Sequence, residues 1–147
     1  MARWLLDTNL LLRSIERSSA HFEEAGQAMD RLAADGDILC VTGQVIVEFW
    51  GVATRPSEAN GLGWEPAAVA SEVDSVLSRF TLLRETADVF PTWLELVRAH
   101  ERKGKQVHDA RLVAVMKAHS VENLLTFNVE DFAAYDEIKA VHPRDVT

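Results

Sequence analysis

Short hydrophobic runs alternate with longer amphipathic segments along the chain. The runs at residues 3–7, 37–42, 81–85 and 123–127 indicate four buried strands, and residues 138–143 indicate a fifth. Apolar residues recur at helical spacing from about residue 9 and over 21–36, 43–54, 65–80, 91–104 and 107–120. This alternation predicts an α/β fold with a central parallel sheet of four to five short strands and helices on both faces. The functional crevice of such a fold lies beyond the carboxyl ends of its strands.

Glycine and proline indicate where the helices begin and end. Gly36 and Gly104 are placed to close the second and fifth helices. Pro66 and Pro91 stand near the first positions of two others, where proline needs no amide hydrogen. The helix over 43–54 is expected to stop before Pro56, because proline disfavours helix in the residue ahead of it.

Two carboxylates stand where the pattern calls for hydrocarbon. Asp7 ends the first strand and so faces the crevice, although the same position also suits a cap for the following helix. Glu48 lies on a helical stripe whose three other members are apolar. A buried carboxylate without a partner costs several kcal/mol, so Glu48 needs either an arginine, such as Arg55 or Arg13, or a metal ion.

Three later polar residues raise the same question. Asp109 heads an apolar stripe in the first turn of its helix; the helix dipole favours an acid there but does not explain its place on the buried side. Asn128 and Asp131 follow the fourth strand, where they could form a capping-box-like arrangement or face the crevice. Their spacing leaves both interpretations open.

The charge and composition of the chain indicate that these acids bind a metal ion. The net charge of −8 argues against a general nucleic-acid-binding surface, although residues 100–120 carry five basic against two acidic residues. Carboxylates that share a pocket raise one another's pKa values, and a divalent cation removes that conflict. Oxygen ligands suit Mg²⁺ or Mn²⁺ rather than Zn²⁺, and the five histidines show no ligand-like spacing with Cys40. Such a site suits phosphodiester hydrolysis.

The remaining composition sets broad limits. One cysteine excludes an internal disulfide, and Cys40 is expected to fill core. No segment approaches the roughly 20 apolar residues of a membrane span. We therefore expect one domain over residues 1–147 in a cytoplasmic protein that makes no membrane contact.

Four motifs together resemble the PIN-domain family and, within it, the VapC-type ribonuclease toxins of bacterial toxin–antitoxin pairs. They are "LLDTN", "VIVEFWGVATRP", "GKQVHDARLVA" and "LLTFNVEDF". The resemblance spans essentially the whole chain. It implies a metal-dependent endoribonuclease that uses Mg²⁺, or Mn²⁺ in its place, and cleaves RNA phosphodiesters with a metal-activated water.

The resemblance also assigns roles to residues. It makes Asp7, Glu48, Asp109 and Asp131 both catalytic and metal-binding, with Asn128 as an alternative fourth position, because Asn128 stands where many members have Asp. It makes Thr8, Asn9 and Thr126 site-ordering residues. Arg13, Arg111 and Lys117 are candidates for RNA contacts. The implied partners are a cognate VapB-type antitoxin, an RNA substrate and a second copy of the chain in a homodimer, with operator DNA bound only through the antitoxin.

Other functions remain as alternatives. A haloacid-dehalogenase-type phosphatase would need a second Asp where Asn9 stands, and a receiver domain fits the third strand poorly. A PIN nuclease of another RNA-processing pathway remains open. So does a catalytically decayed interaction module, for which Trp64 and Phe90 are exposed aromatic candidates.

Overall fold

The structure is a computed structural model that describes residues 1–146. Its strands are β1 (Arg3–Leu6), β2 (Ile38–Thr42), β3 (Thr81–Leu83), β4 (Asn123–Leu125) and β5 (Lys139–Val141). Its α-helices are α1 (Thr8–Ile15), α2 (Phe22–Ala34), α3 (Gly43–Thr54), α4 (Pro66–Arg79), α5 (Val89–Ala99) and α6 (Gln106–Ala118). Short 3-10 helices are η1 (Ser57–Ala59), η2 (Val129–Phe132) and η3 (Pro143–Asp145). The predicted α/β class is confirmed.

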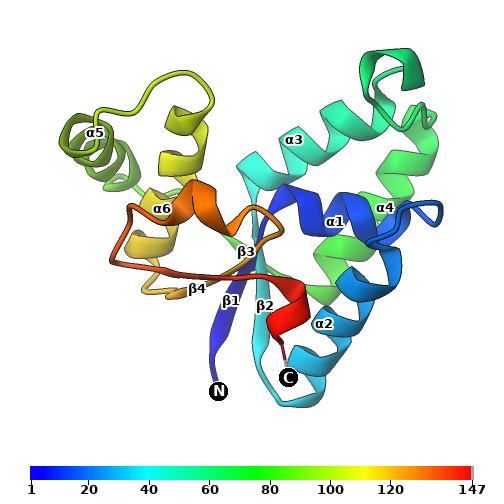
Figure 1. Cartoon of the computed structure of the whole chain (residues 1–147), viewed down its shortest axis with the longest axis horizontal. Helices are drawn as coiled ribbons and strands as arrows, with labels where there is room; N and C mark the ends of the chain where they lie inside the picture. Colours follow the sequence, from blue (N-terminus) through cyan, green and yellow to red (C-terminus); the bar gives the residue numbers. More distant parts are fainter. Residues whose placement is uncertain (147) are drawn as a thin grey trace.

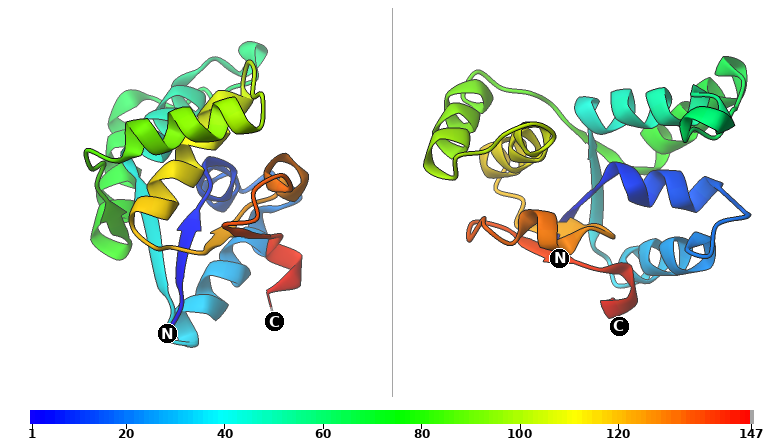
Figure 2. Two further views of the ribbon diagram at one scale, coloured as in Figure 1. Left: turned by 90° about the vertical axis from the view of Figure 1, so that its left-hand side faces the viewer. Right: turned by 45° about the horizontal axis from the view of Figure 1, so that its top comes forward.

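The five strands form one parallel sheet in the order β3-β2-β1-β4-β5. The central strand β1 places Leu5 between Cys40 of β2 and Leu124 of β4, and all three side chains are fully buried. Helices α5 and α6 lie on one side of the sheet, and α1 and α2 lie on the other (Figures 1 and 2). The apolar residues of β1, β2 and β4 fill the centre of the sheet, as expected for strands that are covered on both faces, whereas the edge strands β3 and β5 are partly exposed.

Several helices begin at the carboxyl edge of the sheet. Strand β1 leads directly into α1, β2 leads into α3, and β4 leads through a short turn into η2 (Figure 1). Because the strands are parallel, these transitions lie at the same edge. The polar residues at the strand ends therefore meet there, as the sequence predicted for the crevice.

Helix ends follow the sequence prediction in one case and not in another. Gly36 closes α2 in the left-handed conformation, with φ of 85°, as predicted. Helix α5 ends at Ala99, so its predicted closure at Gly104 is wrong. Glu101 takes the left-handed conformation with φ of 49°, and the amide of Arg102 donates to the carbonyl of Val97, which closes the helix five residues earlier.

The two aromatic candidates for exposure differ. Phe90 is 66% exposed, as expected. Trp64 is partly buried and packs against the core, so the expectation of an exposed Trp64 is wrong. Among residues 1–146, no helix combines the length and apolar character that crossing a membrane requires.

Candidate metal and nuclease site

Asp7 occupies the junction between β1 and α1, where it is 8% exposed. It caps α1: its Oδ1 accepts a hydrogen bond of 2.8 Å from the amide of Thr8. Its Oδ2 accepts one of 2.8 Å from the hydroxyl of Thr126 and one of 3.3 Å from the amide group of Asn9. Burial raises the pKa of Asp7, against the hydrogen bonds from Thr126 and Thr8. The cap interpretation is therefore confirmed, but capping uses only one of the two oxygens.

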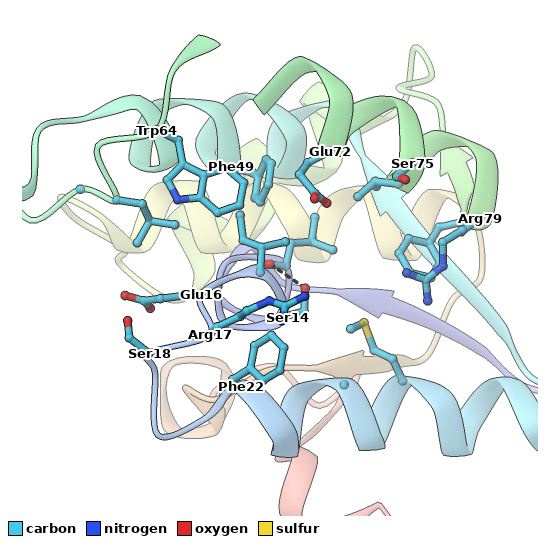
Figure 3. A pocket seen from close by; sticks show the side chains of 18 of the residues that line it. Ser14, Glu16, Arg17, Ser18, Phe22, Phe49, Trp64, Glu72, Ser75 and Arg79 are labelled. Atoms are coloured by element: carbon cyan, nitrogen blue, oxygen red, sulfur yellow. Dashed lines mark hydrogen bonds between the residues drawn. The ribbon is translucent and has the colours of Figure 1, made fainter. Parts of the chain in front are cut away.

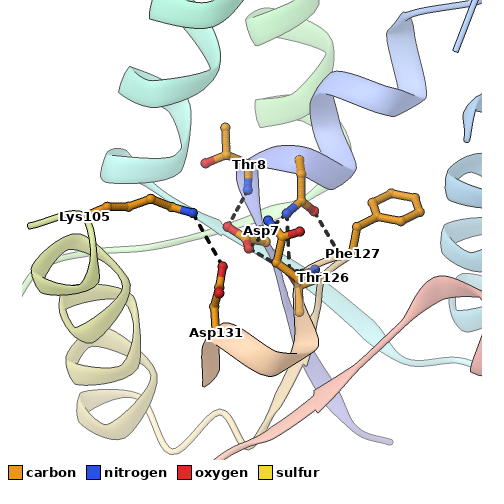
Figure 4. Close-up of polar contacts among 8 residues, drawn as sticks. Asp7, Thr8, Lys105, Thr126, Phe127 and Asp131 are labelled. Atoms are coloured by element: carbon orange, nitrogen blue, oxygen red, sulfur yellow. Dashed lines mark hydrogen bonds and ion pairs between the residues drawn. The ribbon is translucent and has the colours of Figure 1, made fainter. Parts of the chain in front are cut away.

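Thr126 and Asn9 tie the end of β4 to the start of α1. The Thr126 side chain is fully buried, and its hydroxyl accepts from the side chain of Asn9 at 3.3 Å and from the amide of Asn128 at 3.0 Å. The side-chain oxygen of Asn9 accepts a hydrogen bond of 3.2 Å from the backbone amide of Phe127. Figure 4 shows this network around Asp7. The contacts hold the Asp7 carboxylate in a single orientation.

Glu48 reaches the same edge from the second turn of α3. Its Oε2 accepts a 3.1 Å hydrogen bond from the hydroxyl of Thr8, and its Oε1 accepts one of 2.9 Å from Gln44. Thr8 thus bridges Glu48 to Asp7. Neither arginine considered from the sequence pairs with Glu48 within residues 1–146, since Arg13 pairs with Glu16 instead. The arginine interpretation of Glu48 is wrong.

Gln44 is a residue that sequence reasoning missed. It is 9% exposed and uses both ends of its amide group. Its nitrogen donates to Glu48 and, at 2.9 Å, to the backbone carbonyl of His108, while its oxygen accepts from Arg111 at 3.0 Å. Gln44 therefore links α3 to the first turn of α6. Its position one helical turn before Glu48 was the available signal.

Asp109 lies in the first turn of α6 and is partly buried. Within residues 1–146 its carboxylate accepts no hydrogen bond. In this respect Asp109 differs from Asp7 and Glu48, whose carboxylates both accept hydrogen bonds. Burial raises the pKa of Asp109 to about 6, against the attraction of Lys105, and the negative charges of Asp7, Asp131 and Glu48 add to the rise. This coupling places Asp109 in the same electrostatic neighbourhood as the other three acids.

Asp131 and Asn128 come from the η2 segment. Asp131 is exposed, and its Oδ2 lies 3.5 Å from the Nζ of Lys105, the ion pair that Figure 4 shows. The Asn128 side chain makes no capping hydrogen bond to η2, so the capping-box interpretation is wrong. Lys105 is a second residue that sequence reasoning missed, although it belongs to the basic stretch at residues 100–120.

The site is rich in acidic residues, but these residues do not yet form a complete set of metal ligands. In the part of the chain from 1 to 146, no three His, Cys, Asp or Glu side chains already stand as a group that could hold a metal ion. The available donors are all carboxylate, hydroxyl or amide oxygens, the set that hard cations such as Mg²⁺ prefer. No residue from 1 to 146 donates a hydrogen bond to the Asp109 carboxylate and its pKa is raised, so its chemistry fits a residue whose charge a cation would stabilise.

The three predicted RNA-contacting residues all face acidic partners. Arg13 pairs with Glu16, and Arg111 pairs with Glu85 as well as with Gln44. Lys117 lies 3.8 Å from Glu137 near the far end of α6. Two helical turns separate Lys117 from Asp109, about 12 Å along the axis. Arg111 is connected to Glu48 through Gln44, which accepts from Arg111 and donates to Glu48.

A groove on the surface lies away from these acids. It has a volume of about 850 Å³ and lies between the ends of α1 and α2 on one side and α4 on the other. Figure 3 shows Phe22, Phe49 and Trp64 there together with Arg17 and Arg79. None of the four acids lines this groove. The candidate chemistry is therefore defined by the acids at the carboxyl edge of the sheet rather than by this groove.

The chain is similar to a known protein family and to several solved structures. A model of the PIN domain matches residues 4–138. A search of curated protein sequences gives no significant match. Among solved structures, VapBC2 of Rickettsia felis bound to a fragment of promoter DNA matches with a TM-score of 0.72 and 18% identity, over 95% of this chain and 98% of that one.

Two further structures show a similar likeness. The Mycobacterium tuberculosis toxin VapC20, which cleaves the sarcin–ricin loop, matches with a TM-score of 0.64 and 22% identity, over 92% of this chain and 98% of that one. A toxin–antitoxin complex from Klebsiella pneumoniae matches with a TM-score of 0.65 and 23% identity, over 97% and 98%. At these identities the likeness shows a shared fold along nearly the whole of each chain.

Proposed function

The chain belongs to the PIN-domain family, and from that premise we propose that it is a metal-dependent endoribonuclease acting as the toxin of a VapBC-type pair. The observation that carries the proposal is the bridge from Asp7 through Thr8 to Glu48, with Asp109 and Asp131 electrostatically coupled to it. Asp109 at the start of α6 and Asp131 in η2 come from two further segments at the same edge of the sheet, where α/β folds place their chemistry.

The four acids have different roles toward a cation in this proposal. Asp7 and Glu48 are held in place by their hydrogen bonds and form the fixed side of the site. Asp109 and Asp131 are less restrained, and their carboxylates would complete the set of residues that holds Mg²⁺ or Mn²⁺. Asn128 is the alternative to Asp131. A cation stabilises all of these charges, because it replaces mutual repulsion with attraction.

A bound divalent cation would supply charge neutralisation at the scissile phosphate and a lower pKa for an attacking water. The chain contributes orientation. Thr126, Thr8 and Asn9 keep the Asp7 carboxylate from turning, and Gln44 does the same for Glu48. Asp131, exposed at the rim, aligns the attacking water through a carboxylate oxygen that can take up its proton.

The proposal extends to partners and setting. The similar structures include a toxin–antitoxin complex from Klebsiella pneumoniae and VapBC2 of Rickettsia felis bound to promoter DNA. We therefore expect a VapB-type antitoxin to inhibit the protein, and operator DNA to be bound through that antitoxin. We further propose one nuclease domain over residues 1–147, a homodimer and a cytoplasmic location.

The test is cleavage of RNA by purified protein. Wild-type protein should cleave RNA in the presence of Mg²⁺ or Mn²⁺, and excess EDTA should abolish this cleavage. The variants Asp7→Asn, Glu48→Gln and Asp109→Asn should each lose at least about a hundredfold in rate, since each removes a charge from the site. Asp74→Asn, an exposed aspartate on α4, is the matched control and should cleave normally. Full activity in any of the three site variants, or in EDTA, contradicts the assignment.

A cellular experiment separates a toxin from a PIN nuclease of another pathway. Induced expression should arrest growth, and the adjacent small gene should relieve the arrest. An active nuclease that leaves growth unchanged would favour another role in RNA processing.

A further inference from the structure

Lys105 brings a positive charge to the acidic site. Its Nζ lies 3.5 Å from Asp131 Oδ2, and Figure 4 shows its side chain reaching from the start of α6 toward Asp131 and Asp7. Its charge also acts on Asp7 and Asp109, because it opposes the rise in the pKa of both carboxyls. Lys105 therefore interacts with three of the four acids, although a single contact pairs it with one of them.

The backbone around Lys105 is fixed, whereas its side chain is free. Gly104, with φ of 57°, turns the chain into α6, and the Lys105 carbonyl accepts from the amide of His108 at 3.1 Å. Two residues after Lys105, the carbonyl of Val107 accepts a hydrogen bond of 2.8 Å from the indole of Trp93 on α5. The Lys105 side chain itself is 74% exposed. The ammonium group can therefore move while its point of attachment stays at the site.

The contact between Lys105 and Asp131 is easily exchanged. It is long, it is exposed on both sides, and exposed ion pairs of this kind contribute little to stability. The other basic residues nearby are engaged more closely. Arg111 is held by Gln44 and Glu85, and Arg13 lies 2.5 Å from Glu16. Of these three cations, Lys105 is the one best placed to accept a new anionic partner beside the acids.

We propose that Lys105 binds a phosphate of the RNA next to the reacting one, and that it releases Asp131 when it does so. This inference rests on the proposed function, because it supplies that site with a substrate contact. Without a substrate, Lys105 neutralises part of the charge of the acids. When RNA arrives, the ammonium moves to a phosphate oxygen, and Asp131 becomes available to the cation and the attacking water.

The inference predicts opposite effects on two ligands. Lys105→Met removes a positive charge from the acids, so Mn²⁺ should bind more tightly, by about twofold to fivefold. The same change removes a phosphate contact, so RNA should bind about threefold to tenfold more weakly. The slope of log affinity against log salt should fall by about 0.7, the value for one contact to single-stranded nucleic acid. A variant that simply folds poorly would have a lower affinity for both ligands.

The experiment compares full-length wild type, Lys105→Met and Lys103→Met. Lys103 is an exposed lysine two residues away, so its replacement changes the net charge equally. Mn²⁺ binding is measured by isothermal titration calorimetry. RNA binding is measured by fluorescence anisotropy of a labelled, random-sequence oligoribonucleotide in Ca²⁺, over about 50 to 200 mM salt. Gels made after each titration check that the RNA remains intact.

The expected result is tighter Mn²⁺ and weaker RNA binding for Lys105→Met, with both affinities of Lys103→Met within about twofold of wild type. Unchanged RNA affinity, loss of both ligands, or an equal effect of Lys103→Met overturns the inference and leaves the proposed function standing. If the wild type neither binds Mn²⁺ nor cleaves RNA, the proposed function itself has failed, and the inference fails with it.

Discussion

Replacing Asp109 with asparagine should stabilise the metal-free protein while abolishing its activity. The reason is that the Asp109 carboxylate is partly buried, accepts no hydrogen bond from residues 1–146 and stands among other negative charges, which together raise its pKa to about 6. An asparagine side chain of nearly the same shape carries no charge there. Residues kept for function at the expense of stability are expected at active sites.

The magnitude follows from the pKa. The gap between the usual value of 3.8 and about 6 corresponds to about 3 kcal/mol at about 1.36 kcal/mol for each pH unit. Solvent screening reduces this for a side chain that is only partly buried, so we expect a gain of about 1 to 2 kcal/mol at pH 7.5.

The pH dependence has a definite sign. The folded protein binds the Asp109 proton more tightly than the unfolded chain does, so ionisation of Asp109 destabilises the fold as the pH rises from 3.8 through about 6. The advantage of Asp109→Asn should therefore be full above pH 7 and should shrink as the pH falls below 6 toward 3.8.

Urea unfolding in EDTA tests this at pH 7.5 and at about pH 4.5, with Asp74→Asn as the control. The control should change the free energy of unfolding by less than about 0.5 kcal/mol at both values. A destabilised Asp109→Asn at pH 7.5, or an equal stabilisation at both pH values, would refute the electrostatic reasoning.

Three further changes test the supports of the site and the fold by urea unfolding. Gln44→Leu leaves several buried polar groups without partners and should lower the free energy of unfolding by about 1 to 3 kcal/mol; a loss below about 0.5 kcal/mol would contradict its linking role. Thr126→Val removes the 2.8 Å hydrogen bond to Asp7 and should cost about 1 to 2 kcal/mol, whereas Thr126→Ser should retain most of it; equal losses would show that the hydroxyl is not responsible. Gly61→Ala places a Cβ 1.9 Å from the carbonyl oxygen of Arg55 and should cost more than about 1 kcal/mol; a neutral change would mean that the turn after α3 relaxes freely.

The order of strands and helices could be predicted because local patterns determine it. The helix over 43–54 was predicted with the bounds that α3 has, because its apolar residues recur at helical spacing and Pro56 follows its end. The order of strands in the sheet was not predicted. It depends on which faces pack together, and hydrophobic periodicity alone does not specify that. The end of α5 was missed because Glu101 adopts a conformation that usually requires glycine.

Within the candidate site, sequence patterns indicated charged residues on buried faces but not the neutral and basic residues that contact them. Asp7, Glu48 and Asp109 were noticeable because an acid on an apolar stripe is unusual. Gln44 and Lys105 drew no attention, since amides and lysines are common on helix surfaces. Their contacts join segments more than 20 residues apart, and no spacing rule reaches that far.

The proposed site requires a divalent cation to bind acids from four segments of the chain at the same time. Paramagnetic broadening by Mn²⁺ of assigned backbone amide resonances tests it most directly. Substoichiometric Mn²⁺ should broaden the amide resonances around Asp7, Glu48, Asp109 and Asp131 together, while those of α4 persist, and Asp7→Asn should abolish the effect. Broadening of these four segments at different Mn²⁺ concentrations, or of only some of them, would contradict it.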